Sequence, residues 1–108
     1  MRLSQGDIVA LELPFTDLSG SKLRPALVLN AKDLAEDVIV AKITGTPGKY
    51  RVKIEQRDLL EGKLKKMSYV DVSSIFTIEK KLIKRRIGRL REEALGRVKE
   101  ELRLLFGL

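Results

Sequence analysis

The dipeptide Arg24-Pro25 is the part of this sequence with the clearest potential for chemistry. It follows a polar loop with turn residues at 19–21 and precedes the apolar run Ala26–Leu29. Because proline disfavours a helical conformation in the residue before it, Arg24 is expected to be extended. A guanidinium held there either lies in solvent beside a hairpin loop or contacts an anion such as a phosphate. Local spacing alone favours the solvent-exposed interpretation.

Two missing residue types narrow the chemistry further. The chain has no cysteine, which excludes disulfides and thiolate metal sites, and no histidine, the commonest acid–base catalyst near neutral pH. A general base would therefore have to be a carboxylate, a hydroxyl chain or water. Glu12, Asp17 and Asp71 are the carboxylate candidates, and the sequence does not choose among them.

The 108 residues carry a net charge of +7, which is distributed unevenly. Between Lys80 and Arg103 there are ten lysines or arginines and four glutamates. This segment favours a polyanionic partner, either RNA, DNA or an acidic protein, although a solvated or thermophile-type surface has the same composition. There is no apolar N-terminal run long enough for a signal peptide or membrane span. We therefore expect a cytoplasmic protein without a membrane partner.

The hydrophobic pattern predicts a single domain over residues 1–108, mainly β with a C-terminal helix. Apolar residues at three- and four-residue spacing indicate an amphipathic helix over Glu92–Phe106, with Gly107 as its stop. One helical turn is expected at 56–62, a turn at Gly88, and core positions for Phe76 and Phe106. The expected strands are Asp7–Leu13, Pro25–Asn30, Val38–Ile43 closed by Thr44, Tyr50–Ile54, Tyr69–Val72 and Ile75–Ile78. Together these elements predict a strongly bent sheet or small barrel.

With these segments defined, the chain resembles the MazF/PemK family of toxins from toxin–antitoxin modules. The resemblance covers nearly the whole length and depends on the order of several motifs. These are Gly6-Asp7-Ile8-Val9, Pro14-Phe15-Thr16-Asp17, Ser19-Gly20-Ser21-Lys22, Arg24-Pro25-Ala26-Leu27-Val28-Leu29, Val38–Thr44, Phe76-Thr77-Ile78, Lys81-Leu82-Ile83 and Ile87-Gly88-Arg89-Leu90.

The resemblance implies a sequence-selective endoribonuclease that cuts single-stranded RNA without a metal or other cofactor. It also implies an SH3-like barrel, a homodimer, and an antitoxin whose disordered acidic tail covers the RNA groove. By resemblance the catalytic pair is Arg24, the arginine before proline, and Thr44, which closes the third strand. The further RNA-binding candidates are Thr16, Asp17, Lys22, Ser68 and Asp71, of which Lys22 lies two residues from Arg24 and could hold a phosphate.

One departure from the family pattern lies in the fifth strand. Many relatives carry an arginine there, followed two residues later by an acid. Alignment on Ser68 and Phe76 puts Asp71 at the arginine position and Ser73 at the acid position, so the local charge is inverted. The inversion could change the RNA sequence recognised or weaken cleavage. Three aromatic residues, Phe15, Tyr50 and Tyr69, are candidates either for stacking on bases or for packing.

Two other functions fit the same sequence. A related toxin branch with a similar fold poisons DNA gyrase through protein contacts, and other SH3-like barrels bind RNA without cleaving it. The third possibility is a toxin that has lost its activity. Arg24 and Thr44 separate these cases, because a protein-binding poison does not require them. The basic run from Lys80 to Arg91 fits an RNA backbone or a solvated strand equally well.

Overall fold

The computed structural model describes residues 2–12 and 23–108. Within them, seven strands form one antiparallel sheet in the order β4-β6-β3-β2-β1-β7-β5, followed by one α-helix. The elements are β1 (Asp7–Leu11), β2 (Arg24–Val28), β3 (Asp37–Thr44), β4 (Arg51–Ile54), η1 (Gln56–Asp58), β5 (Leu59–Gly62), β6 (Ser68–Glu79), η2 (Lys80–Leu82), β7 (Ile83–Leu90) and α1 (Glu92–Phe106). The predicted mainly β fold with a C-terminal helix is confirmed, and α1 has the predicted bounds.

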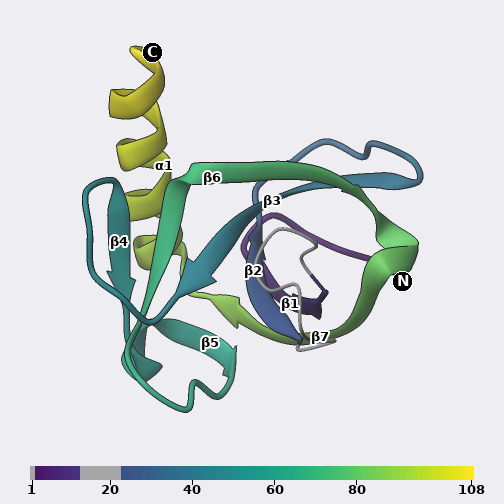
Figure 1. Cartoon of the computed structure of the whole chain (residues 1–108), viewed down its shortest axis with the longest axis horizontal. Coiled ribbons are helices and arrows are strands. Elements are labelled where there is room, and N and C mark those ends of the chain that lie inside the picture. Colours follow the sequence, from purple (N-terminus) through teal and green to yellow (C-terminus); the bar gives the residue numbers. More distant parts are fainter. Residues whose placement is uncertain (1, 13–22) are drawn as a thin grey trace.

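The sheet separates two apolar clusters because side chains alternate along its central strands. Ile8 and Leu27 belong to a cluster completed by Val98 of α1, whereas their neighbours Val9 and Val28 belong to the second cluster. In Figure 1, β6 runs across the top, bends, and is followed by β7 along the bottom, so the two strands curl around β1 and β2. One face of the sheet is therefore covered by α1 and the other by the sheet's own curvature.

The junction of β5 and β7 corrects two predictions. Gly88 lies inside β7 and not in a turn, and the helical turn expected at 56–62 is limited to η1, with β5 following it. A Cβ atom at Gly88 would lie 2.8 Å from the carbonyl oxygen of Glu61, and Gly62 has a φ of +92°. The glycines thus allow two backbones to approach closely. In a sequence, a glycine with this role looks the same as a turn glycine.

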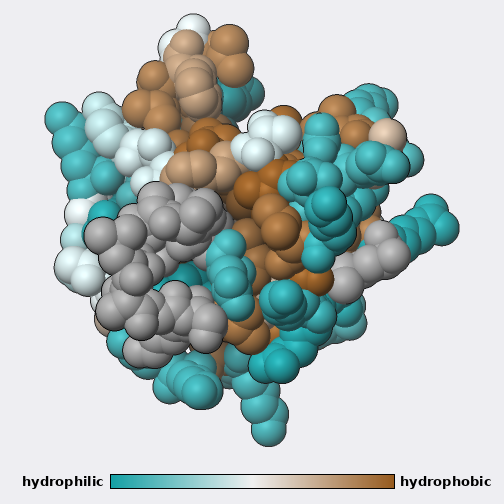
Figure 2. All heavy atoms as spheres, turned by 45° about the vertical axis from the view of Figure 1, so that its right-hand side comes forward, coloured by the Kyte–Doolittle hydropathy of each residue, from teal (hydrophilic) through white to brown (hydrophobic). Residues whose placement is uncertain are grey.

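The end of α1 differs from the prediction that Phe106 is a core residue. Its side chain is exposed, as are those of Leu104 and Leu108, because the last turns of α1 project beyond the sheet (Figure 1). Figure 2 shows the resulting apolar surface at the top of the molecule. Phe76, also expected in the core, is half-buried against the second cluster. Among the described residues, no helix combines the length and apolarity that a membrane crossing requires.

Asp7 is a buried carboxylate that joins the start of β1 to β7. Its Oδ1 accepts a hydrogen bond of 2.8 Å from Arg89 Nε and lies 3.1 Å from Arg86 Nε, and its Oδ2 accepts one of 2.8 Å from the Ser4 amide. Arg86 also contacts Glu61 of β5 at 3.0 Å. Burial alone would raise the pKa of Asp7, but the bonds from Arg89, Ser4 and Arg86 outweigh it, and the pKa is lowered. The carboxylate therefore ties three strands together as an anion.

Candidate active site

Arg24 and Thr44 lie at the same end of two neighbouring strands. β2 and β3 are antiparallel, their paired segment ends with Ala26 opposite Lys42, and Arg24 and Thr44 each lie two residues beyond that pair. Because side chains alternate along a strand, Arg24 shares the sheet face of Ala26 and Thr44 shares that of Lys42. Both line one surface hollow of about 350 Å³. The structure thus brings together the two residues predicted as a catalytic pair, and their catalytic role stays a prediction.

The alternation of β3 determines which side chains reach this hollow. Ala41 and Ile43 are buried in the cluster beneath α1, so Lys42 and Thr44 extend from the opposite face of the strand. Lys66 contributes from the loop before β6; its Nζ would lie 3.0 Å from a Cβ atom placed at Gly45. The described residues that line the hollow are Arg24, Pro25, Lys42, Ile43, Thr44, Gly45, Lys66 and Ser68.

Charge in the hollow is of one sign. Its described lining contains three cationic side chains, those of Arg24, Lys42 and Lys66, and no carboxylate. A concave surface lined by charges of one sign concentrates ligands of the other, here anions. The Nε atom of Arg24 is buried and has no hydrogen-bond partner among residues 2–12 and 23–108. A buried N–H donor without a partner is costly, which favours a site where an anion supplies the missing acceptor.

The remaining predicted RNA-binding residues divide into three groups. Ser68 lines the hollow and is buried, and its hydroxyl donates to the Lys66 carbonyl oxygen at 3.1 Å. Asp71 lies on the same sheet face, opposite Lys42 in the register, but it does not line the hollow. Thr16, Asp17 and Lys22 lie outside the described residues, as does Phe15. None of these roles is tested by the geometry, and all stay predictions.

Asp71, which occupies the position where many relatives carry an arginine, is buried, and its carboxylate accepts four hydrogen bonds. Its Oδ1 accepts from the Ser73 hydroxyl at 2.6 Å and the Ser73 amide at 3.0 Å, and its Oδ2 accepts from Ser74 and from Arg51 Nε, both at 3.1 Å. Burial would raise the pKa of Asp71, but the bonds from Ser73, Ser74 and Arg51 together lower it. Because a carboxylate stabilised in this way accepts a proton poorly, Asp71 is unsuited to be the general base.

Three functional candidates escaped the sequence interpretation: Lys42, Lys66 and Arg51. Lys42 had a usable signal, since it lies two residues before Thr44 in a strand and so shares its face. Lys66 had none, because it lies in the loop between β5 and β6, where no periodicity fixes a direction. Of the aromatic candidates, Tyr50 is half-buried against the cluster beneath α1, and the register places Tyr69 opposite Thr44.

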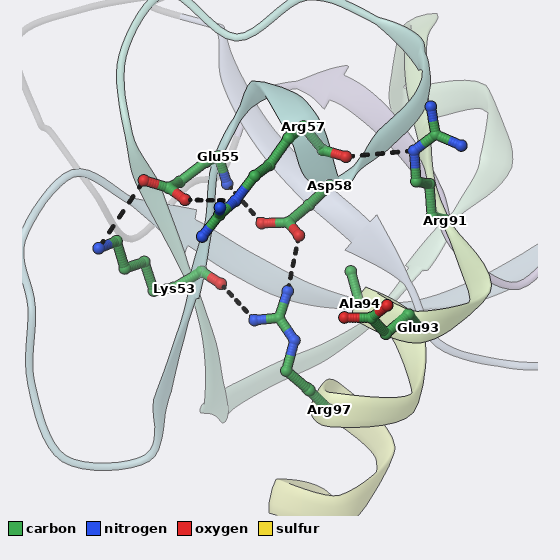
Figure 3. A pocket seen from close by; sticks show the side chains of 8 residues that line it. All are labelled: Lys53, Glu55, Arg57, Asp58, Arg91, Glu93, Ala94 and Arg97. Atoms are coloured by element: carbon green, nitrogen blue, oxygen red, sulfur yellow. Dashed lines mark hydrogen bonds and ion pairs between the residues drawn. The ribbon is translucent and has the colours of Figure 1, made fainter.

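A second hollow, of about 510 Å³, lies between η1, β4 and α1 (Figure 3). Its charged groups largely satisfy one another: Arg97 bonds Asp58 at 2.8 Å, Arg57 bonds Glu55 at 2.9 Å, and Arg91 Nε donates to the Arg57 carbonyl oxygen at 3.1 Å. These contacts attach α1 to the η1 segment. This hollow is therefore a structural junction between α1 and the η1 segment, whereas the hollow at Arg24 has no carboxylate in its described lining.

A family model described as the PemK-like, MazF-like toxin of type II toxin–antitoxin systems matches residues 4–106. The chain belongs to this toxin family. Comparison with curated protein sequences finds no match. The family membership rests on the model, which spans nearly the whole chain, and it confirms the resemblance drawn from the motifs.

Solved structures of MazF toxins share the fold. The toxin MazF-mt6 of Mycobacterium tuberculosis is 25% identical, with a TM-score of 0.75 over 94% of this chain and 97% of that one. A mycobacterial endoribonuclease in complex with its cognate antitoxin is 17% identical, with a TM-score of 0.76 over 98% and 94%. A MazE–MazF structure from Deinococcus radiodurans is also 17% identical, with a TM-score of 0.76 over 98% and 96%. The curled sheet with its C-terminal helix is thus the MazF fold.

Proposed function

We propose that this toxin is an endoribonuclease that cleaves single-stranded messenger RNA in the cytoplasm, with sequence selectivity and through attack of the 2′-hydroxyl. The observation that carries the proposal is that Arg24 and Thr44 line one hollow together with the cationic side chains of Lys42 and Lys66. Family membership and the endoribonuclease named among the structural neighbours support it. Among the described residues, no group of acidic side chains is arranged to hold a metal ion.

In the proposed reaction, the 2′-hydroxyl oxygen forms a bond to the adjacent phosphorus while the bond to the 5′-oxygen breaks. The products are a 2′,3′-cyclic phosphate and a 5′-hydroxyl end, and the 5′-oxygen takes its proton from water. Negative charge increases on the non-bridging phosphoryl oxygens in the transition state. Arg24 donates two N–H groups to these oxygens, and the hydroxyl of Thr44 donates a third hydrogen bond.

Proton transfer needs groups other than these two. A guanidinium remains protonated in proteins, so Arg24 stabilises charge but does not accept the 2′-hydroxyl proton. With Asp71 engaged by four donors, the proton acceptors left from the sequence are Glu12, Asp17, a hydroxyl chain and water. Glu12 is exposed at the end of β1, and Asp17 lies outside the described residues.

In the proposed complex, Lys66 contacts an RNA phosphate next to the one that is cleaved. We expect Lys66→Ala to raise KM for a short RNA substrate about three- to tenfold at low salt, with kcat changed less than twofold. The physical reason is that a backbone phosphate contact binds ground state and transition state alike. Steady-state cleavage measured at several salt concentrations checks this, since the variant's KM should depend less steeply on salt. A fall in kcat with unchanged KM would instead place Lys66 at the scissile phosphate.

The function itself is tested with purified toxin and a mixed single-stranded RNA in the presence of EDTA. Discrete fragments that end in 2′,3′-cyclic phosphates are expected. Intact RNA that nevertheless binds the protein would indicate a binding module of the same fold. Intact RNA without binding, together with capture of a protein such as DNA gyrase, would indicate a gyrase-poison-like toxin.

The hollow at Arg24 also suggests a protein partner. We propose that a cognate antitoxin inserts an acidic, disordered segment into the hollow of Arg24, Lys42 and Lys66, where it competes with RNA for the cations. Complexes of toxin and antitoxin among the structural neighbours support this.

We also propose a homodimer, supported by the exposed apolar end of α1 at Leu104, Phe106 and Leu108. Sedimentation at micromolar concentration is expected to give twice the chain mass.

A further inference from the structure

The inverted charge at Asp71 is accompanied by an arginine on the neighbouring strand. β6 lies between β3 and β4, and Asp71 is opposite Lys42 on one side and opposite Arg51 on the other. Arg51 Nε donates to Asp71 Oδ2 at 3.1 Å, and the carboxylate has 6% of its side-chain surface exposed. The arginine that many relatives carry at this position of β6 is absent here, and Arg51 of β4 places a guanidinium beside it. The two residues form an ion pair across the strands beside the site.

Arg51 also reaches the turn that follows Thr44. Its Nη1 donates to the Thr46 carbonyl oxygen at 2.9 Å, while Nε remains on Asp71. Pro47 restricts Thr46 to an extended conformation, so this turn has few alternative shapes. A Cβ atom at Gly48 would lie 3.0 Å from Arg51 Cδ and 3.3 Å from Nε, so glycine at 48 leaves the space that the arginine crosses. The guanidinium therefore bridges a buried carboxylate and a turn of the site.

The backbone of this 44–46 turn contacts the hydroxyl of Thr44. The Thr46 amide donates to Thr44 Oγ1 over 3.4 Å, a long hydrogen bond that occupies a lone pair of the hydroxyl. A hydroxyl that accepts this bond keeps its own proton for donation, and Thr44 lines the hollow that it shares with Arg24. Ser73 and Ser74 hold Asp71 at the far end of this chain of contacts, where β6 carries a register irregularity against β3.

We propose that Asp71 and Arg51 are positioning residues that fix the 44–46 turn, so that the Thr44 hydroxyl acts as a donor toward the phosphate bound at Arg24. This inference depends on the proposed nuclease function for its catalytic readout. It assigns the inverted position a role in orienting Thr44 rather than in contacting RNA. Arg51 is suited to this because its planar guanidinium serves two acceptors at once, whereas a lysine in its place has a single ammonium on a flexible chain.

The test uses Arg51→Lys, which keeps the charge but loses the two-point bridge, and Asp71→Asn, which removes the charge with little change in shape. Each is expected to lower kcat about tenfold, with KM within twofold, because a displaced catalytic group affects the transition state more than substrate binding. Arg57→Lys is the matched control, since Arg57 forms an exposed ion pair with Glu55 away from the hollow. It should retain the wild-type kcat.

A mutant cycle separates positioning from general destabilisation. In a Thr44→Val background, followed in single-turnover reactions over hours, Arg51→Lys should cause no further loss of rate, because the group that it positions is absent. An additive loss in that background, or a wild-type kcat in the single variants, would overturn the proposal.

A readout without RNA keeps this inference separate from the function. The Thr46 amide proton should exchange with solvent faster in Arg51→Lys than in the wild type, while the global free energy of unfolding changes little. If the wild-type protein cleaves no RNA, the proposed function fails and this exchange rate alone decides the positioning role. An unchanged Thr46 exchange rate would refute it in either case.

Discussion

Replacement of Arg24 with alanine is expected to slow RNA cleavage by about a hundred- to a thousandfold while the fold is retained. The size follows from the loss of a preorganised charged donor at the oxygens where charge develops, for which a factor of about 10² to 10³ is typical. Stability should be preserved because the Nε of Arg24 is buried without a hydrogen-bond partner in the described part of the chain, so the substitution removes a costly unpaired donor. Single-turnover cleavage and thermal unfolding of the same preparation measure the two quantities.

Two further variants make this test specific. Arg24→Lys keeps the charge but loses the paired donors, so its rate should fall between the wild type and Arg24→Ala. Arg57→Ala removes the same charge from an exposed side chain near the second hollow and should leave cleavage unchanged. Wild-type activity in Arg24→Ala would remove Arg24 from the mechanism. An equal loss in Arg57→Ala would show that only net charge matters.

The architecture was largely accessible to sequence reasoning because it depends on periodicity. The four-residue spacing from Val98 to Leu102 and the alternation in β4 each reflect one buried face, and those elements lie where the pattern predicts them. The wrong predictions concern residues whose type is compatible with two different structural roles. Gly88 serves a close approach of backbones inside β7, and Phe106 continues an apolar stripe beyond the last residue of the sheet that could cover it.

The site was only partly accessible because it combines segments distant in sequence. Arg24 and Thr44 were found through a resemblance, and the structure places both in the lining of one hollow. Arg51 could not be assigned from sequence, since its meaning depends on β6 lying between β3 and β4, a long-range pairing. Asp71 looked anomalous for the same reason. In the folded sheet, the carboxylate of Asp71 forms an ion pair with Arg51 of the neighbouring strand.

Replacement of Asp7 with asparagine is expected to lower the free energy of unfolding by about 3 kcal/mol at neutral pH, the scale for removing one partner of a buried ion pair. The reason is that Arg86 and Arg89 lose the carboxylate that both contact, at 3.1 and 2.8 Å, while asparagine keeps the shape. Chemical denaturation measures the change. Asp33→Asn is the matched control, because that exposed carboxylate bonds Lys80 at 3.3 Å and the Ala35 amide at 2.9 Å, and the asparagine oxygen can still accept from the amide. The free energy of unfolding should be almost unchanged in this variant.

The pH dependence of the same variant tests the cause. The pKa of Asp7 is lower in the folded than in the unfolded chain, so the carboxylate stabilises the fold above its unfolded pKa of about 4 and the contribution is lost as the pH falls through the folded pKa. The unfolding free energies of wild type and Asp7→Asn should therefore run parallel above about pH 5 and converge in more acidic solution. Asp71 keeps its lowered pKa in both proteins, so acid should still destabilise the variant, only less steeply. A constant difference down to strongly acidic pH would mean that Asp7 acts through packing and not through its charge.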